Sequence, residues 1–152
     1  MSQKSMLLKY VKTHVHQELA DDIIKEVNFG GKSKWYPNAF SADLKKCLDE
    51  IIPSETEYFC QSAKLYDHDC LKRASTELSK HKIFHKHFSG FYVFGQTESC
   101  AEIIVGPNGN VVILHIDEDK LEVHNNFMTL NDFLENACMD NIDESDSPTI
   151  LK

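Results

Sequence analysis

The stretch AEIIVGPNGNVVILHIDEDKLEVH, from Ala101 to His124, decides the fold. It holds three short segments, the first two rich in β-branched residues, which predict three strands at Ala101–Val105, Val111–Ile116 and Leu121–His124. Between the first two runs, Asn108-Gly109 predicts a hairpin turn, because both residues tolerate positive φ. The stretch is therefore interpreted as an antiparallel meander.

The flanks extend this unit on both sides. Phe91–Phe94 is aromatic and β-branched and predicts a preceding strand, while Asp117–Lys120 predicts a second tight connection inside the meander. After the meander, Thr129 and Asp132 have the spacing of a capping box. We therefore expect a closing helix that runs to about Met139 and buries Leu130, Phe133, Leu134 and Ala137.

The N-terminal part is helical in pattern. Apolar residues at steps of three and four predict an amphipathic helix over residues 6–27, which Gly30-Gly31 ends. Ser41 is the expected N-cap of a second helix that Pro53 stops, and residues 69–81 predict a third. Residues 54–67 leave short strands open at Tyr58–Cys60 and Leu65-Tyr66.

Helices followed by a meander and a final helix indicate an α+β domain. We expect an antiparallel sheet of about four to six strands, with the N-terminal helices and the C-terminal helix packed on one face. At 152 residues, one domain is expected, spanning residues 1–139. Residues 140–152 are acidic and are interpreted as a flexible tail.

The first hairpin predicts a register. If Asn108-Gly109 form a two-residue turn, Ile103 lies opposite Leu114, and Glu102 lies opposite His115. Because side chains alternate between faces along a strand, this register puts Leu114 on an apolar face and His115 on the other.

The second hairpin extends the same two faces. A two-residue turn at Glu118-Asp119 predicts the pairs Leu114–Val123, His115–Glu122 and Ile113–His124. One face is then wholly apolar and is expected to lie under the helices. The other face is expected to carry Glu102, His115 and Glu122 in one row.

Charge is unevenly distributed along the chain. The formal net charge is −8, made up of +2 from residues 1–96 and −10 from residues 97–152. Arg73 is the only arginine. Because nucleic-acid binders need clustered lysine and arginine, direct binding of nucleic acid is not expected. An acidic surface instead suits a basic protein partner.

No motif in the sequence indicates catalysis or a cofactor. Five cysteines lack CxxC spacing and are interpreted as reduced thiols. His81 and His85 have helical pair spacing, with His87 nearby, but a structural zinc site needs four ligands, and no metal is predicted. We therefore expect a protein that is not an enzyme. No apolar run reaches membrane-spanning or secretory length, which favours a cytoplasmic location without membrane contact.

Three segments of the chain carry a family resemblance. They are FYVFG (Phe91–Gly95), AEIIVGPNGNVVILHIDED (Ala101–Asp119) and NNFMTLNDFLENA (Asn125–Ala137). Gly109-x-Val111 and Leu130-x-x-Phe133-Leu134 stand where the SUKH superfamily has its central-strand and closing-helix motifs, and Tyr36-Pro37-x-x-Phe40 is similar to its entry into an early helix. The second half of the chain thus resembles SUKH immunity proteins of bacterial polymorphic toxin and contact-dependent growth inhibition systems.

The resemblance implies a toxin inhibitor that binds a cognate toxin domain and blocks its active site. Many such toxins are basic nucleases, for whose cationic surface an acidic protein would compete with nucleic acid. The alternative is a general protein-interaction or regulatory domain of the same fold with no toxin partner, since a fold does not fix a function. The expected partner-binding residues are Glu98, Glu102, His115, Asp117, Glu118, Asp119, Glu122 and His124.

Overall fold

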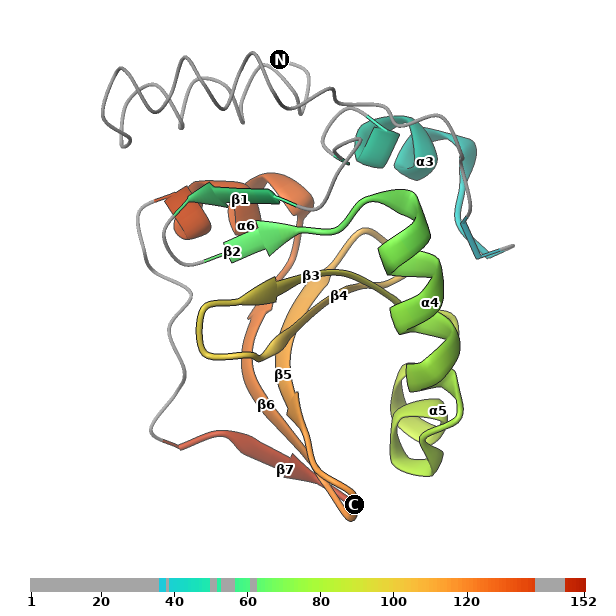
Figure 1. Ribbon diagram of the computed structural model, residues 1–152, viewed down its shortest axis with the longest axis vertical. Coiled ribbons are helices and arrows are strands. Elements are labelled where there is room, and N and C mark those ends of the chain that lie inside the picture. The colour runs from blue at the N-terminus through green and yellow to red at the C-terminus, as the bar shows by residue number, and fades with distance from the viewer. Residues whose placement is uncertain (1–35, 38, 50–51, 53–56, 61–62, 139–146) are drawn as a thin grey trace.

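The computed structural model describes residues 36–37, 39–49, 52, 57–60, 63–138 and 147–152 (Figure 1). The predicted first helix and its Gly30-Gly31 stop lie outside these residues. In chain order the elements are α3 (Ala42–Asp49), β1 (Glu57–Cys60), β2 (Ala63–Leu65), α4 (His68–Ser79), α5 (Lys82–Phe88), β3 (Tyr92–Thr97), β4 (Glu102–Val105), β5 (Val111–Ile116), β6 (Leu121–Phe127), α6 (Leu130–Cys138) and β7 (Thr149–Leu151).

The strands form one antiparallel sheet in which spatial order follows chain order. β1 to β6 make the meander, so the α+β class and the meander expected from the sequence are confirmed. β7 adds a further strand beside β6, with Leu151 opposite Leu121 and Thr149 opposite Val123. The prediction of a flexible tail over residues 140–152 is wrong for Thr149–Leu151.

Side chains cap the starts of the helices. The Ser41 hydroxyl accepts a hydrogen bond from the backbone N–H of Leu44, at 3.1 Å, and Thr129 accepts one from Asp132 at the same distance. Both caps confirm the sequence signals. Asp67 caps α4 by accepting from the N–H of Cys70 at 2.8 Å. These bonds satisfy donors that a helix start leaves without a partner.

The β4–β5 hairpin differs from the predicted register. Gly109 has φ +85°, and its N–H donates to the carbonyl of Gly106, while the N–H of Gly106 donates to Asn110. The loop therefore holds three residues rather than two, a common alternative when glycine takes the left-handed position. The pairing shifts by one residue, so that Glu102 lies opposite Leu114 and Ile103 opposite Ile113.

The β5–β6 hairpin follows the prediction only near its turn. Leu114 lies opposite Val123 and His115 opposite Glu122, as expected. The register then shifts, and Ile113 lies opposite Asn125 rather than His124. His124 is the extra residue of a β-bulge, which alternating polarity along the strand does not reveal.

Side chains on both faces of β5 are buried. Val111 and Ile113 belong to a first cluster, while Val112 and Leu114 belong to a second, and none of the four is more than 3% exposed. The predicted division into one apolar and one polar face is therefore wrong in the centre of the sheet. A continuous apolar run is the usual mark of a strand covered on both sides.

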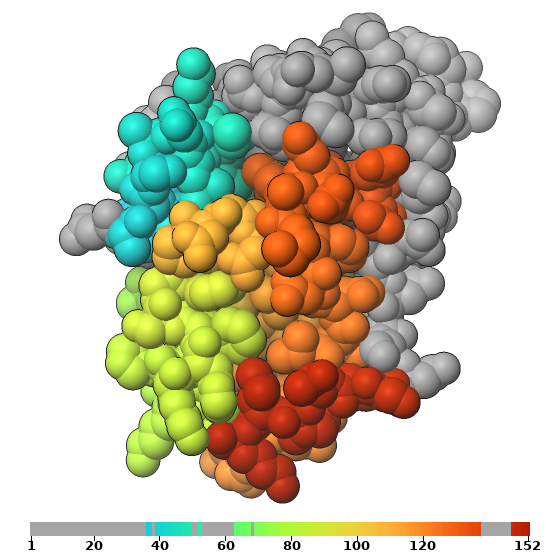
Figure 2. Space-filling view, turned by 180° about the vertical axis from the view of Figure 1, so that it is seen from behind, coloured from blue at the N-terminus to red at the C-terminus, as the bar shows by residue number. Residues whose placement is uncertain are grey.

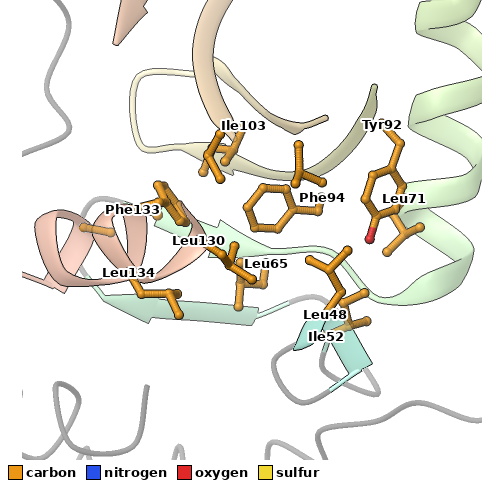
Figure 3. Packing of buried hydrophobic residues seen from close by; sticks show 14 of the residues in the cluster. Leu48, Ile52, Leu65, Leu71, Tyr92, Phe94, Ile103, Leu130, Phe133 and Leu134 are labelled. Atoms are coloured by element: carbon orange, nitrogen blue, oxygen red, sulfur yellow. The ribbon is translucent and has the colours of Figure 1, made fainter. Parts of the chain in front are cut away.

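The helices divide between the two clusters, although the sequence analysis placed them on one face. Leu48 of α3 and Phe133 of α6 join the first cluster, and Figure 3 shows them beside Phe94 and Leu65 of the sheet. Phe84 of α5 joins the second cluster. α4 contributes to both, with Leu71 in the first and Leu78 packed against the second. No helix among the described residues is long and apolar enough to cross a membrane.

Two neighbouring substitutions test burial on both faces. Ile113→Ala and Leu114→Ala should each lower the free energy of unfolding by roughly 2–5 kcal/mol, because each removes a buried side chain from a different cluster. Denaturant titration measures this, with exposed Glu118→Ala as the control, expected within about 0.5 kcal/mol of the wild type. A sheet with one covered face would instead show a large loss for only one of the two.

Candidate functional site

Three of the six acidic residues of the predicted site lie together at the turn between β5 and β6. Asp117, Glu118 and Asp119 are all exposed between β5 and β6. The N–H of Asp117 donates to the carbonyl of Lys120 at 3.0 Å, which closes the turn as predicted. Lys120 pairs with Glu122 at 3.0 Å and lies 3.9 Å from Asp117. This ion pairing raises the pKa of Lys120, chiefly through its hydrogen bond to Glu122.

His81 connects this turn to the start of α5. Its Nδ1 accepts the backbone N–H of Phe84 at 3.2 Å, which caps α5. Its Nε2 lies 2.7 Å from the carbonyl oxygen of Asp117. Since Nδ1 acts as an acceptor, the proton is assigned to Nε2, which donates to Asp117. One imidazole thus fixes both the start of α5 and the position of the acidic turn.

Three predicted residues gather beside the turn. His115 lies opposite Glu122, as expected, and its ring packs edge-on against that of His124 with centroids 5.0 Å apart. Nε2 of His124 lies 3.7 Å from Oε2 of Glu122. The His124 side chain is only 5% exposed and that of Glu122 25% exposed. These residues flank the acidic turn and expose little surface to a partner.

Glu102 does not belong to this group. The observed register places it with Leu114, on the face opposite His115, in a row with Gln96 and Lys64. The predicted row of Glu102, His115 and Glu122 is therefore wrong, because it depended on the two-residue turn. Among the described residues, the buried Oε2 of Glu102 has no hydrogen-bond partner. Burial raises the pKa of this carboxyl, against the opposing effects of its bond to Gln96 and the charges of Lys64 and His115.

Glu98 lies on a separate turn. It is exposed between β3 and β4, two strands from the β5–β6 turn. Because the sheet is antiparallel, both turns lie at the same end of the strands. The exposed carboxylates of the predicted site are thus Glu98 and the Asp117–Asp119 group.

The histidines considered as a metal pair have separate surroundings. His81 precedes α5 and both of its ring nitrogens contact backbone atoms, whereas His85 is exposed on the helix. Within the part of the chain that the structure describes, no group of three or more His, Cys, Asp or Glu side chains could hold a metal ion. The absence of a metal stays a prediction.

Sequence reasoning missed two residues of the site. His81 was considered as a metal ligand and interpreted instead as part of a solvated or partly buried histidine cluster, because a histidine N-cap has no strong sequence signature. Lys120 was read only as part of a turn, yet it ion-pairs with Glu122 and closes the turn. For Lys120, the predicted two-residue turn was the available signal, because such a turn places Asp117 and Lys120 next to each other.

Comparison with known proteins gave no match. No protein-family model matches the chain, and no curated protein or solved structure does. The SUKH resemblance of the sequence therefore stays a prediction.

Glu102→Gln tests the buried carboxyl. Because its folded pKa lies above the ordinary value of 4.5, protonation stabilises the fold below that pH, and this contribution is lost as the pH rises through the raised pKa. The neutral glutamine should therefore make the protein more stable than the wild type at pH 7, and the difference should shrink towards pH 4. Denaturant titrations at both pH values measure this, with exposed Glu98→Gln as the matched control. A variant that is less stable than the wild type by the same margin at both pH values would contradict this assignment.

Two substitutions at His81 separate its roles. His81→Ala removes the α5 cap and the bond to Asp117, and should cost about 1–2 kcal/mol of unfolding free energy. His81→Asn keeps a capping oxygen but is too short to reach the turn, so it should cost less. In both variants, amide exchange at Asp117, whose N–H donates to Lys120 and closes the turn, should accelerate. Unchanged exchange would show that the imidazole does not hold the turn.

Proposed function

We propose that this chain is a non-enzymatic immunity protein that binds a cognate basic toxin domain, of the nuclease type, and blocks its active surface. The interaction would take place in the bacterial cytoplasm and would require no metal or cofactor. The observation that carries the proposal is the Asp117–Asp119 turn, which exposes three carboxylates and whose backbone at Asp117 is bonded to His81 and Lys120.

A fixed turn favours binding for two reasons. Its backbone is already ordered, so docking loses less conformational entropy than docking of a flexible acidic segment would. Its exposed charges also accelerate encounter with a cationic surface and help to select the partner. Docking of several carboxylates on the basic surface of a nuclease would displace the phosphates of its substrate.

The proposed contact surface is smaller than the set predicted from the sequence. Glu98 and the Asp117–Asp119 group present carboxylates to solvent at the same end of the strands. His115, Glu122 and His124 support that end from a half-buried position. Glu102 is half-buried on the face of the sheet opposite His115, so Glu102→Lys is expected to destabilise the fold rather than to report on docking.

Co-expression with the product of a neighbouring toxin-like reading frame tests the proposal. The wild-type chain should restore growth and bind the purified toxin domain. Glu118→Lys with Asp119→Lys should slow association about tenfold or more and should flatten its dependence on salt, because rim charges mainly govern the association rate.

A matched control is available on the helices. Glu77→Lys with Glu135→Lys makes the same change of charge at exposed positions of α4 and α6. This control should bind and protect like the wild type. The proposal fails if both double variants lose binding equally, or if the turn variant binds as tightly and as fast as the wild type.

A further inference from the structure

The acidic turn lies beside a basic helix. The bond from His81 to Asp117 joins the start of α5 to the β5–β6 turn. Further along α5, Lys86 and His87 each place a side-chain nitrogen 3.3 Å from the carbonyl oxygen of Lys152, next to the end of β7. Figure 2 shows residues 147–152 against the helical layer at this end of the molecule. The turn, α5 and the end of β7 thus form one continuous surface.

Opposite charges lie next to each other on this surface without pairing. Glu118 and Asp119 form its acidic half, while Lys82 and Lys86 form its basic half, and all four are exposed. Within the described residues none of the four makes an ion pair, and the bond of Lys86 goes to a carbonyl oxygen. Their charges are therefore available to another molecule.

We propose that two copies of this chain associate through this surface about a two-fold axis. Such an axis places the acidic half of each copy against the basic half of the other, so that the patch is complementary to itself. Ile83 and Ile116, both half-buried at the edge of the second cluster, lie on α5 and at the end of β5 and add apolar contact. Because exposed ion pairs contribute little each, the dimer is weak and sensitive to salt.

The mixed charge of the surface favours a second copy of the chain over a nucleic acid. A nucleic acid would be repelled by Glu118 and Asp119, whereas a second copy offers both signs in matching positions. The proposal concerns the isolated protein and does not depend on the proposed function. A basic partner that docks on the acidic turn would compete with the second copy.

A charge exchange between two variants tests the dimer. The acid-reversed variant carries Glu118→Lys and Asp119→Lys, and the base-reversed variant carries Lys82→Glu and Lys86→Glu. In sedimentation equilibrium at protein concentrations up to about 1 mM, the wild type should dimerise at about 50 mM salt, with a dissociation constant about tenfold higher at about 500 mM. Neither variant should dimerise alone. Their equimolar mixture should form a heterodimer at least about tenfold more tightly than either variant associates with itself.

For both charge-reversed variants, the effect of the altered net charge can be separated from the loss of the surface. The control variant Lys72→Glu with Arg73→Glu alters the net charge as much as the base-reversed variant does, but at exposed positions of α4. It should dimerise like the wild type. The acid-reversed variant moves the net charge of −8 towards zero, so its loss of association cannot come from overall repulsion. A wild type that is monomeric at low salt overturns the proposal, as does a mixture that associates no better than its two components.

Discussion

Burial of β5 on both of its faces is the constraint on which the rest of the fold depends. Val111 to Leu114 are buried in succession, so apolar material must cover both sides of the sheet centre. α3 and α6 supply it to one side and α5 to the other, while α4 contributes to both. Charged side chains are thereby excluded from the middle of β5. Charged side chains instead lie at the strand ends, in turns that are exposed to solvent.

This exclusion explains why the exposed carboxylates lie on turns rather than on a sheet face. Glu98 and the Asp117–Asp119 group are exposed between strands, whereas Glu102, within a strand, is half-buried and has a raised pKa. Segments of opposite charge also meet among the described residues. His81 and the end of β7 bring the acidic turn against the basic α5, although these segments lie more than thirty residues apart in the chain.

Much of the architecture could be predicted from local sequence. The strands of the meander, the cap at Ser41, the cap at Thr129 and the buried face of α6 each follow from short-range patterns. The register of the first hairpin could not be predicted, because Asn108-Gly109 is compatible with both a two-residue and a three-residue loop. The one-residue difference in loop length places Glu102 on the face of the sheet opposite the predicted one. The run Val111–Leu114 was the available signal, since four consecutive apolar residues favour burial on both sides over alternation.

The candidate site could be predicted only in part, because it too depends on strand register. The pair His115–Glu122 follows from a turn of fixed length, whereas the position of His124 depends on a bulge that tertiary packing selects. The role of His81 depends on contact between distant segments, which no local pattern records.

The register of β4 against β5 is the most direct test of this account. Nuclear Overhauser effects between backbone protons report which residues lie opposite each other in an antiparallel pair, because paired Cα atoms are only about 4.5–5.5 Å apart. The account predicts cross-strand contacts between Glu102 and Leu114 and between Ile103 and Ile113. Contacts between Glu102 and His115 and between Ile103 and Leu114 would contradict it, since they would put Ile103 of the first cluster on the same face as Leu114 of the second.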